Sequence, residues 1–282
     1  MLSDFLIGNY TDTEKKTGVT VLLAPKGATG GVSVRGGAPA THETDLFRAE
    51  NTVEKVNAIV LSGGSAFGLE ATSGVMRYLL EHGVGYDAGG YRVPIVAGAS
   101  IYDLECGAFA FPTRENGYEA AKAAKPIETT AGPVGAGAGA TVCKTGGMAG
   151  ALPSGMAVVT GQIGKVEMAV IVVVNALGDI YDPDTGAALK KGKASLAPAS
   201  FSNTTIACVL TNARLTKAQA NKLADVTQDA YAKCIRPVHT VYDGDSVFVL
   251  AGGEVESDLF TLQLLADKLC CQAILQAVKS GD

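Results

Sequence analysis

Three consecutive residues, Asn203, Thr204 and Thr205, could support nucleophilic chemistry that needs no histidine. A threonine hydroxyl is activated when its residue is N-terminal, because a free α-amine has a pKa of about 8 and lies within reach of the hydroxyl. The tripeptide stands where a polar stretch meets an apolar strand, so a nucleophile could be presented there. An Asn-Thr pair at a strand start is also ordinary turn chemistry, and these residues alone leave both interpretations open.

Other common catalytic patterns find little support. His42, His82 and His239 form no i,i+4 pair, so their spacing suggests neither a zinc site nor a Ser-His-Asp triad. The six cysteines lack Cys-x-x-Cys spacing and are interpreted as reduced, mostly buried side chains. The segment 63–68 has phenylalanine where a nucleophile elbow needs glycine, and the glycine-alternating segment 134–140 lacks the following helix of a dinucleotide site. We therefore expect no metal and no cofactor.

Composition narrows the class of protein further. With 282 residues and 47% hydrophobic content the chain can bury a large core, as one α/β unit or as two smaller domains. The net charge is -5 and the basic residues are scattered, which argues against nucleic acid and anionic membranes as partners. The longest apolar run, residues 168–174, is too short to span a bilayer, and the N-terminus has no signal-peptide pattern. We expect a soluble, cytoplasmic protein.

The elements that must position Thr204 are short strands alternating with helices. Apolar and β-branched runs predict strands at residues 19–24, 57–62, 94–97, 156–160, 166–175 and 204–210. Periodicity and capping signals predict helices at residues 67–82, 118–125 and 256–279, and one from Thr216 to the residue before Pro237. Residues 190–202 are expected to form an exposed loop, and residues 238–251 a hairpin around an Asp243-Gly244 turn. This mixture favours sheets packed together and covered by helices.

Several segments resemble the DmpA family, which includes L-aminopeptidase/D-esterases, β-peptidyl aminopeptidases and nylon-oligomer hydrolases. The segments are Leu61-Ser-Gly-Gly-Ser-Ala-Phe-Gly-Leu69, Gly135-Ala-Gly-Ala-Gly139, Val174-Asn-Ala-Leu-Gly178, Asn203-Thr-Thr-Ile206, and Arg236-Pro-Val-His-Thr240 followed by Asp243-Gly-Asp245. The resemblance runs in order from about Gly18 to Ala251. It implies an α/β (α+β) fold, a four-layer αββα sandwich similar to N-terminal-nucleophile hydrolases with DmpA-like topology. It also implies that residues 1–282, a single domain, cut themselves into an α subunit, 1–203, and a β subunit, 204–282.

The resemblance assigns the central roles to three residues. Many members have serine at the position of Thr204, and with threonine there the chain more closely resembles the nylon-oligomer hydrolase branch. Thr204 would attack first the Asn203 carbonyl and later a substrate amide. Its methyl group would restrict χ1 and hold the hydroxyl in one rotamer. Asn175 matches the asparagine that stabilises the oxyanion.

Four further residues match supporting positions. Lys144 matches a lysine near the nucleophile, where a cation would keep the Thr204 amine neutral, and Lys165 is the competing lysine. Asp243 and Asp245 match a carboxylate pair that hydrogen-bonds the nucleophile region, and Tyr102 matches a tyrosine of the substrate pocket. Without the family pattern, these residues would be interpreted as ordinary turn, solvated-loop or core residues.

Two other functions compete with amide hydrolysis. One is an acyltransferase of the ornithine acetyltransferase type, which shares a self-cleaving threonine, although the Ala-Thr-Met context of that cleavage site is absent. The other is a small-molecule-binding protein that keeps the fold without cleaving itself. The expected partner of the enzyme is a small amide or short peptide, and its relatives predict a homo-oligomer, a tetramer of αβ units.

Overall fold

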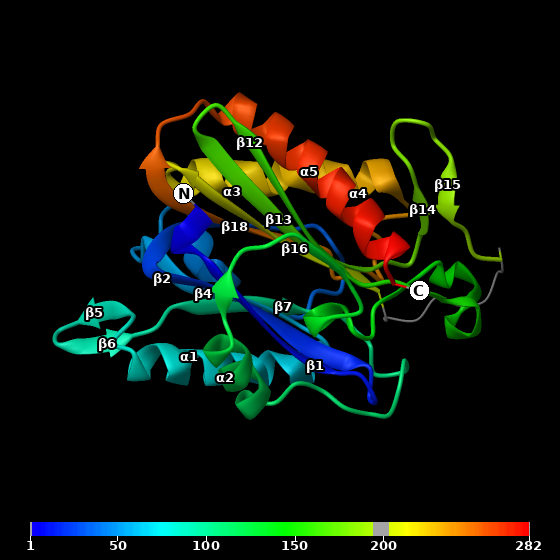
Figure 1. The fold of residues 1–282 in the computed structure, drawn as a ribbon, viewed down its shortest axis with the longest axis horizontal. Coiled ribbons are helices and arrows are strands. Elements are labelled where there is room, and N and C mark those ends of the chain that lie inside the picture. Colours follow the sequence, from blue (N-terminus) through cyan, green and yellow to red (C-terminus); the bar gives the residue numbers. More distant parts are fainter. Residues whose placement is uncertain (1, 194–202, 282) are drawn as a thin grey trace.

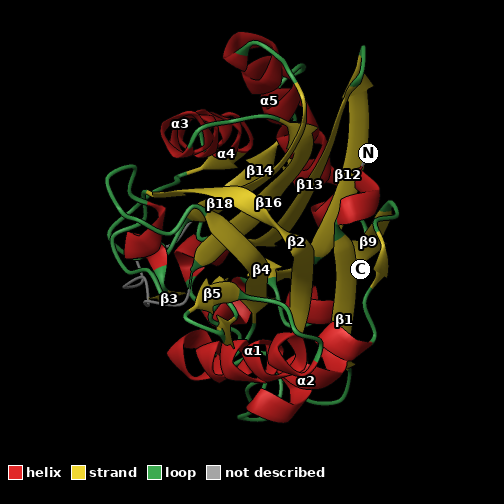
Figure 2. Cartoon of the chain, turned by 90° about the vertical axis from the view of Figure 1, so that its left-hand side faces the viewer, coloured by secondary structure: helices red, strands yellow, loops and turns green. Residues whose placement is uncertain are grey.

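The computed structural model describes residues 2–193 and 203–281, which form four layers (Figure 1). On one outer face lie helices α3 (Lys217–Thr227), α4 (Asp229–Cys234) and α5 (Leu259–Lys279). On the opposite outer face lie α1 (Ala71–Glu81) and α2 (Arg114–Lys122). Two layers of strands fill the space between them, and the view in Figure 2 shows both with their covering helices. The four-layer αββα arrangement predicted above is confirmed.

The two strand layers belong to one continuous hydrogen-bonded path of strands. The layer under α3 and α5, called the upper sheet here, contains β9 (Thr130–Gly132), β12 (Met156–Ile163), β13 (Val166–Asn175), β16 (Thr204–Ala213) and β18 (Ser246–Val255). The layer over α1 and α2, called the lower sheet, contains β1 (Leu6–Asp12), β3 (Thr41–His42), β4 (Lys55–Ser62), β7 (Val96–Ser100) and β8 (Lys125–Pro126). The long strand β2 (Thr17–Val34) joins them.

Strand β2 passes from the lower sheet to the upper sheet. Its first half pairs with β1 and β4, and after a register irregularity between Leu23 and Ala28 its second half pairs with β18. Three shorter sheets decorate this framework. They consist of β5 (Tyr86–Ala88) with β6 (Tyr91–Val93), β10 (Thr141–Val142) with β11 (Leu152–Pro153), and β14 (Asp179–Tyr181) with β15 (Ala188–Lys190) and β17 (Ile235–Arg236).

Strand β13 shows why these sequences form buried strands. Its alternate residues Val170, Val172 and Val174 pack in the hydrophobic cluster under α3–α5, while Ile171 and Val173 pack in the cluster between the two sheets. Because side chains alternate across a strand, a strand buried on both faces is apolar throughout. A third cluster lies between the lower sheet and α1 and α2.

Most element predictions are confirmed, with shifted boundaries. The helix predicted at residues 67–82 is a 3-10 segment, Ser65–Glu70, followed by α1, and the one predicted from Thr216 is divided into α3 and α4 at Gln228. The helix predicted at residues 118–125 begins earlier, at Arg114, and ends at Lys122. Of the loop predicted at residues 190–202, positions 194–202 lie outside the described residues.

The predicted hairpin at residues 238–251 is wrong. Strand β18 pairs in parallel with β16 on one edge and antiparallel with β2 on the other, so no edge is left for residues 238–242. These residues form a loop in which the Asp243 carboxylate accepts hydrogen bonds from the Thr240 amide, 2.7 Å, and hydroxyl, 2.6 Å. An Asp-Gly pair therefore marks a turn here, but the turn does not join two paired strands.

Candidate active site

Thr204 and Asn175 lie opposite each other at one end of the upper sheet. Thr204 is the first residue of β16 and Asn175 is the last residue of β13, and the antiparallel register pairs their Cα positions. Both residues are buried. Strand pairing thus brings the predicted nucleophile beside the predicted oxyanion donor.

The Asn203 carbonyl, which is predicted to be attacked, is held between two donors. The Thr204 hydroxyl donates a hydrogen bond to the Asn203 oxygen, and the Gly244 amide donates to the same oxygen at 3.0 Å. Asn203 and Asp243 form an isolated parallel bridge that fixes this arrangement. The hydroxyl therefore lies next to a carbonyl that already has an amide donor, as stabilisation of an oxyanion requires.

Gly244 allows this close approach because it has no side chain. A Cβ atom at this position would lie 2.8 Å from Thr204 Oγ1 and 3.0 Å from the Ala38 carbonyl oxygen. Both separations are shorter than ordinary carbon-oxygen contacts, so a larger residue would push the loop away from Thr204. The sequence analysis missed this role, because the Asp-Gly pair was interpreted as a hairpin turn.

Lys144 is buried beside Asn175. Its ammonium lies 2.9 Å from Asn175 Oδ1 and 3.0 Å from the Asn175 carbonyl oxygen, and donates to both. Burial lowers the pKa of Lys144 to about 7, although nearby acidic groups, with Cys106 the largest contribution and Asp243 the next, oppose the shift. Lys165, the competing lysine, is exposed in the turn before β13, at the far end of that strand. The structure thus places Lys144, and not Lys165, next to Asn175.

Further contacts fix the side-chain amide of Asn175. Thr141 donates its backbone N–H to Asn175 Oδ1 at 3.0 Å, and Asn175 Nδ2 donates to the Tyr102 carbonyl oxygen at 3.0 Å. Tyr102 therefore reaches the site through its backbone, while its hydroxyl donates to Glu105 Oε1 at 3.0 Å. Thr141 was not identified from the sequence, and a threonine in a glycine-rich segment gives no signal of this contact.

The two aspartates lie on the other side of Thr204 and make different contacts. Asp245 Oδ1 accepts from the Thr205 amide at 2.7 Å, and Asp245 Oδ2 lies 2.8 Å from His239 Nδ1. Asp243 instead binds Thr240, and burial, followed by the negative charge of Asp245, raises the pKa of Asp243. Only Asp245 thus has a hydrogen bond to the start of β16 within the described part of the chain. His239, which spacing alone did not single out, orients that carboxylate.

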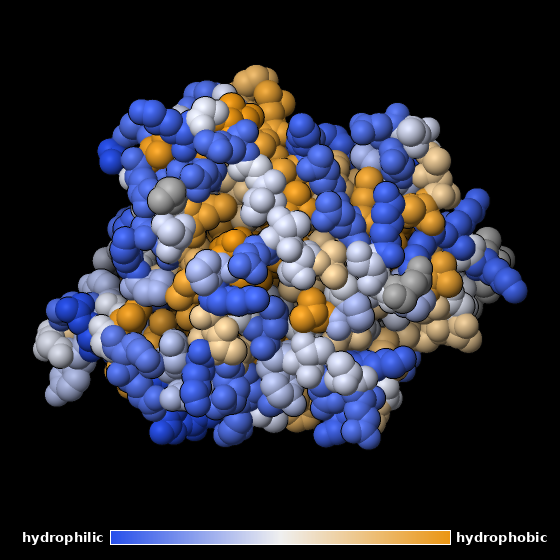
Figure 3. Space-filling view, viewed as in Figure 1, coloured by the Kyte–Doolittle hydropathy of each residue, from blue (hydrophilic) through white to orange (hydrophobic). Residues whose placement is uncertain are grey.

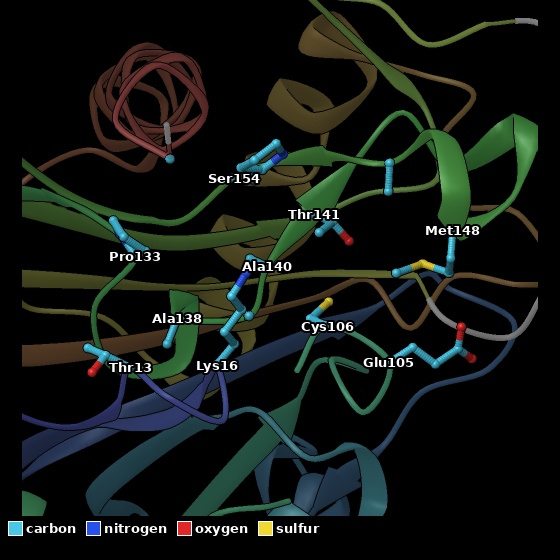
Figure 4. A pocket seen from close by; sticks show the side chains of 14 residues that line it. Thr13, Lys16, Glu105, Cys106, Pro133, Ala138, Ala140, Thr141, Met148 and Ser154 are labelled. Carbon is cyan, nitrogen blue, oxygen red and sulfur yellow. The ribbon is translucent and has the colours of Figure 1, made fainter. Parts of the chain in front are cut away.

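A pocket of about 480 Å³ lies beside this cluster (Figure 4). Thr141 lines it and also contacts Asn175, which connects the pocket to the site. Cys106 points into the pocket, and Lys16 and Glu105 lie on either side of Cys106 in Figure 4. A volume of this size suits a small ligand.

Asp103 holds the loop that carries Tyr102 and Glu105. Its buried carboxylate accepts a hydrogen bond from the Gly64 amide at 2.6 Å. Burial raises the pKa of Asp103 to about 6, and the Gly64 amide is the largest opposing contribution. The loop after β7 is therefore tied to the glycine turn that follows β4.

Residues 2–193 and 203–281 contain neither a candidate metal site nor a candidate membrane-spanning helix. No group of three or more histidine, cysteine, aspartate or glutamate side chains could hold a metal ion there. None of the helices in the same residues is both long and apolar enough to cross a membrane.

Comparison with known sequences identifies relatives over nearly the whole chain. The model of a family described as Peptidase family S58 matches residues 3–280. An uncharacterized aminopeptidase of Mycobacterium leprae is 43% identical over 266 residues, covering 85% of this chain and 72% of the relative. A 6-aminohexanoate-oligomer endohydrolase of Kocuria sp. is 30% identical over 276 residues, covering 89% of this chain and 73% of the relative.

Comparison with solved structures identifies the same fold at low sequence identity. The L-aminopeptidase D-Ala-esterase/amidase of Ochrobactrum anthropi, described as a variant of the Ntn (N-terminal-nucleophile) hydrolase fold, superposes with a TM-score of 0.74 at 14% identity. That match covers 97% of this chain and 83% of the other. A β-aminopeptidase of Burkholderia sp. gives a TM-score of 0.67 at 17% identity, with the same coverage of 97% and 83%. The predicted resemblance and fold class are therefore confirmed.

Proposed function

The chain belongs to peptidase family S58 and is an amide/peptide hydrolase, and from that premise we propose that Thr204 is its nucleophile. In this proposal the chain first cleaves its own Asn203-Thr204 bond and then hydrolyses substrate amides. The observation that carries it is the position of the Thr204 hydroxyl against an Asn203 carbonyl that also accepts the Gly244 amide. Family membership favours hydrolysis over the acyltransferase and the binding protein considered above.

Self-cleavage follows from this geometry in two steps. Thr204 Oγ1 attacks the Asn203 carbonyl carbon, and the Gly244 amide stabilises the oxyanion that forms. Collapse breaks the C–N bond as the leaving nitrogen takes up the proton released by Oγ1. This leaves an ester between Asn203 and Thr204 Oγ1, with a free α-amine on Thr204. Water then hydrolyses the ester, which gives a carboxylate on Asn203 and restores the Thr204 hydroxyl.

The cleaved enzyme would use the new amine as its base. The α-amine of Thr204, with an ordinary pKa of about 8, accepts the hydroxyl proton as Oγ1 attacks a substrate carbonyl. Asn175 lies opposite on β13, and its amide would stabilise the substrate oxyanion. Lys144 binds Asn175 Oδ1, which fixes the side-chain amide, and in its charged form it would keep the amine neutral.

Denaturing electrophoresis with N-terminal sequencing tests the proposal. We expect purified protein to separate into fragments 1–203 and 204–282, with Thr204 as the new N-terminus. Thr204→Ala is expected to remain one chain without amidase activity, because both steps need the hydroxyl. Thr204→Ser keeps the hydroxyl and serves as the matched control, which should still cleave. A wild-type chain that stays intact and nevertheless hydrolyses amides would refute the mechanism.

The substrates proposed for this chain are small peptides and amides. Relatives are named as aminopeptidases and as 6-aminohexanoate-oligomer hydrolases, so amino-acid p-nitroanilides and 6-aminohexanoate oligomers are the substrates to compare. Release of free acid in the absence of an acceptor amine supports hydrolysis. Product that forms only when an amine such as ornithine is present would indicate acyl transfer instead.

A homo-oligomer, specifically a tetramer of αβ units, completes the proposal. Phe260 and Leu264, at the start of α5, are 67% and 55% exposed. Figure 3 shows apolar surface at the top of the molecule, where α5 lies in the same view in Figure 1. Residues four apart share one face of a helix, so the two side chains form a contiguous apolar patch, and such patches mark contact surfaces. Light scattering of the cleaved protein should give four times the mass of one chain, and the mass of a single chain would contradict the proposal.

A further inference from the structure

The pocket beside the site carries one cation and one anion at separated positions. Lys16 comes from the turn between β1 and β2, and Glu105 comes from the loop after β7. Figure 4 places the two side chains on either side of Cys106, with Lys16 extended toward Ala140 and Glu105 below Met148. Cys106 lies between them in Figure 4, and small residues such as Ala138 and Ala140 also line the pocket. A ligand that fits this pocket therefore meets opposite charges at its two ends.

Lys16 is held in place by its backbone. Its φ of 54° lies in the left-handed region, which costs a non-glycine residue about 1 kcal/mol. A Cβ on Gly139 would lie 2.1 Å from the Lys16 carbonyl oxygen, and one on Gly107 would lie 2.3 Å from the Lys15 carbonyl oxygen. The turn is thus packed closely against two glycines. This packing holds the strained backbone in place and fixes the position of the Lys16 Cα atom.

The field of Lys16 reaches into the pocket. Burial raises the pKa of the Cys106 thiol, and the nearby positive charges of Lys144 and Lys16 oppose that shift. No ion-pair partner for the Lys16 ammonium is present among residues 2–193 and 203–281. Its charge is therefore available to an anionic group of a ligand.

Glu105 is attached to the active site through Tyr102. The Tyr102 hydroxyl donates to Glu105 Oε1, and the Tyr102 carbonyl accepts from Asn175 Nδ2, both at 3.0 Å. Glu105 is exposed and lines the pocket, and Tyr102 is the hydrogen-bond partner of its carboxylate within the described residues. A cationic group bound at Glu105 is thereby placed at a fixed separation from Asn175.

We propose that this pocket selects short amides whose two ends are both unblocked. Glu105 binds the free ammonium of the substrate, Lys16 binds its free carboxylate, and the part of the pocket around Cys106 accommodates the aliphatic part between them. The proposal rests on the proposed function, because the amide to be cleaved would lie beside Thr141 and Asn175. It narrows the substrate to linear zwitterions such as unblocked dipeptides and linear amino-acid oligomers.

The test crosses two variants with two blocked ligands. Alanyl-alanine, N-acetyl-alanyl-alanine and alanyl-alanine amide are compared by kcat/KM and, where no hydrolysis occurs, by calorimetric binding to the wild-type protein. We expect the wild type to prefer the unblocked dipeptide about tenfold over either blocked form. Lys16→Met should lose only the preference for the free carboxylate, and Glu105→Gln only the preference for the free amine.

Neighbouring side chains supply matched controls. Lys15→Met and Glu14→Gln make the same charge changes in the turn that carries Lys16, at exposed positions that do not line the pocket, and should keep both preferences. A wild type that does not discriminate between the ligands overturns the proposal. Lys16→Met or Glu105→Gln losing all three ligands equally also overturns it. If the Asn203-Thr204 bond stays intact while the ligand preferences persist in binding, the proposed function is refuted. The proposal that the pocket binds zwitterionic ligands would then still hold.

Discussion

The strand pair β13 and β16 carries a buried asparagine near each end, and the two side chains have different partners. Asn212, near the end of β16, accepts from the Glu167 amide at 2.9 Å and donates to the Lys165 carbonyl at 3.0 Å. Asn175, at the end of β13, instead has the buried Lys144 ammonium on its Oδ1. Both asparagines are nearly inaccessible, so burial does not distinguish them.

The partners explain why only one end can do chemistry. Asn212 forms hydrogen bonds with two backbone groups that would otherwise be unpaired, so it stabilises this strand end. A buried lysine must lose its hydration, which lowers the pKa of Lys144 to about 7 and opposes folding. A buried lysine that destabilises the folded state and lies beside an asparagine and a buried hydroxyl is typical of a catalytic site. Four substitutions can break or sharpen this contrast.

The largest effect is expected from Asn175→Ala. Loss of the side-chain amide should lower kcat/KM about 100- to 1,000-fold, because one oxyanion donor typically contributes about 3–4 kcal/mol to the transition state. The measurement is amide hydrolysis per cleaved chain, with the cleaved fraction read from a denaturing gel. Activity within a few fold of the wild type would assign Asn175 the structural role that Asn212 has.

Asn212→Ala should act on stability and leave catalysis unchanged. The substitution removes two hydrogen bonds and leaves backbone groups at the β12–β13 turn unpaired, so the free energy of unfolding should fall by about 1–3 kcal/mol. Urea denaturation gives this change, and kcat/KM of the folded enzyme is measured in parallel. A large loss of kcat/KM at unchanged stability would mean that the two ends of the strand pair do not differ as described.

The elements of this contrast were predictable to different extents. Both strands follow from β-branched runs at residues 166–175 and 204–210, because local apolar patterns report burial directly. That Thr204 lies opposite Asn175 depends on strand register, which no local pattern specifies. The family resemblance named both residues, but only the structure supplies the pairing that connects them.

Two features around Thr204 were beyond reach of the sequence for a physical reason. Lys144 stands in a glycine-rich segment that is typical of a solvated loop, and its burial comes from packing against residues distant in sequence. The Asp243-Gly244 pair gives a strong hairpin signal, yet β18 is already paired on both edges. The prediction of a turn was correct there, but the prediction that the turn joins two paired strands was wrong.

Lys144→Met should raise stability while it lowers activity. The folded state holds Lys144 with a pKa of about 7, against 10.5 for the ordinary side chain, so between these values the unfolded chain binds a proton that the folded chain does not. Wild-type stability from this group therefore rises with pH from about 7 to 10.5 and is flat below about 7, where both states are protonated. The variant should lack this slope, so its advantage over the wild type should shrink by about 1.4 kcal/mol for each pH unit above 7.

Urea denaturation of wild type and Lys144→Met at pH 7, 8 and 9 measures this slope. The two stability curves are expected to converge as the pH rises, because the wild type loses its disadvantage once the unfolded chain also releases the proton. Parallel curves would show that Lys144 titrates normally in the folded protein. In that case the contrast with Asn212 would rest on the contacts of Asn175 alone.

The smallest effect is expected from Lys165→Met, the matched change at the opposite end of β13. Lys165 is exposed, and its contact with Asn212 uses the backbone carbonyl, which the substitution keeps. The turn conformation is set by Gly164, with a φ of 59°, and does not depend on the lysine side chain. Stability should therefore change by less than about 0.5 kcal/mol and kcat/KM should not change. A large loss of activity would mean that Lys165 reaches a nucleophile outside its own chain, and the lysine of the reaction would then have to be sought across a contact between copies.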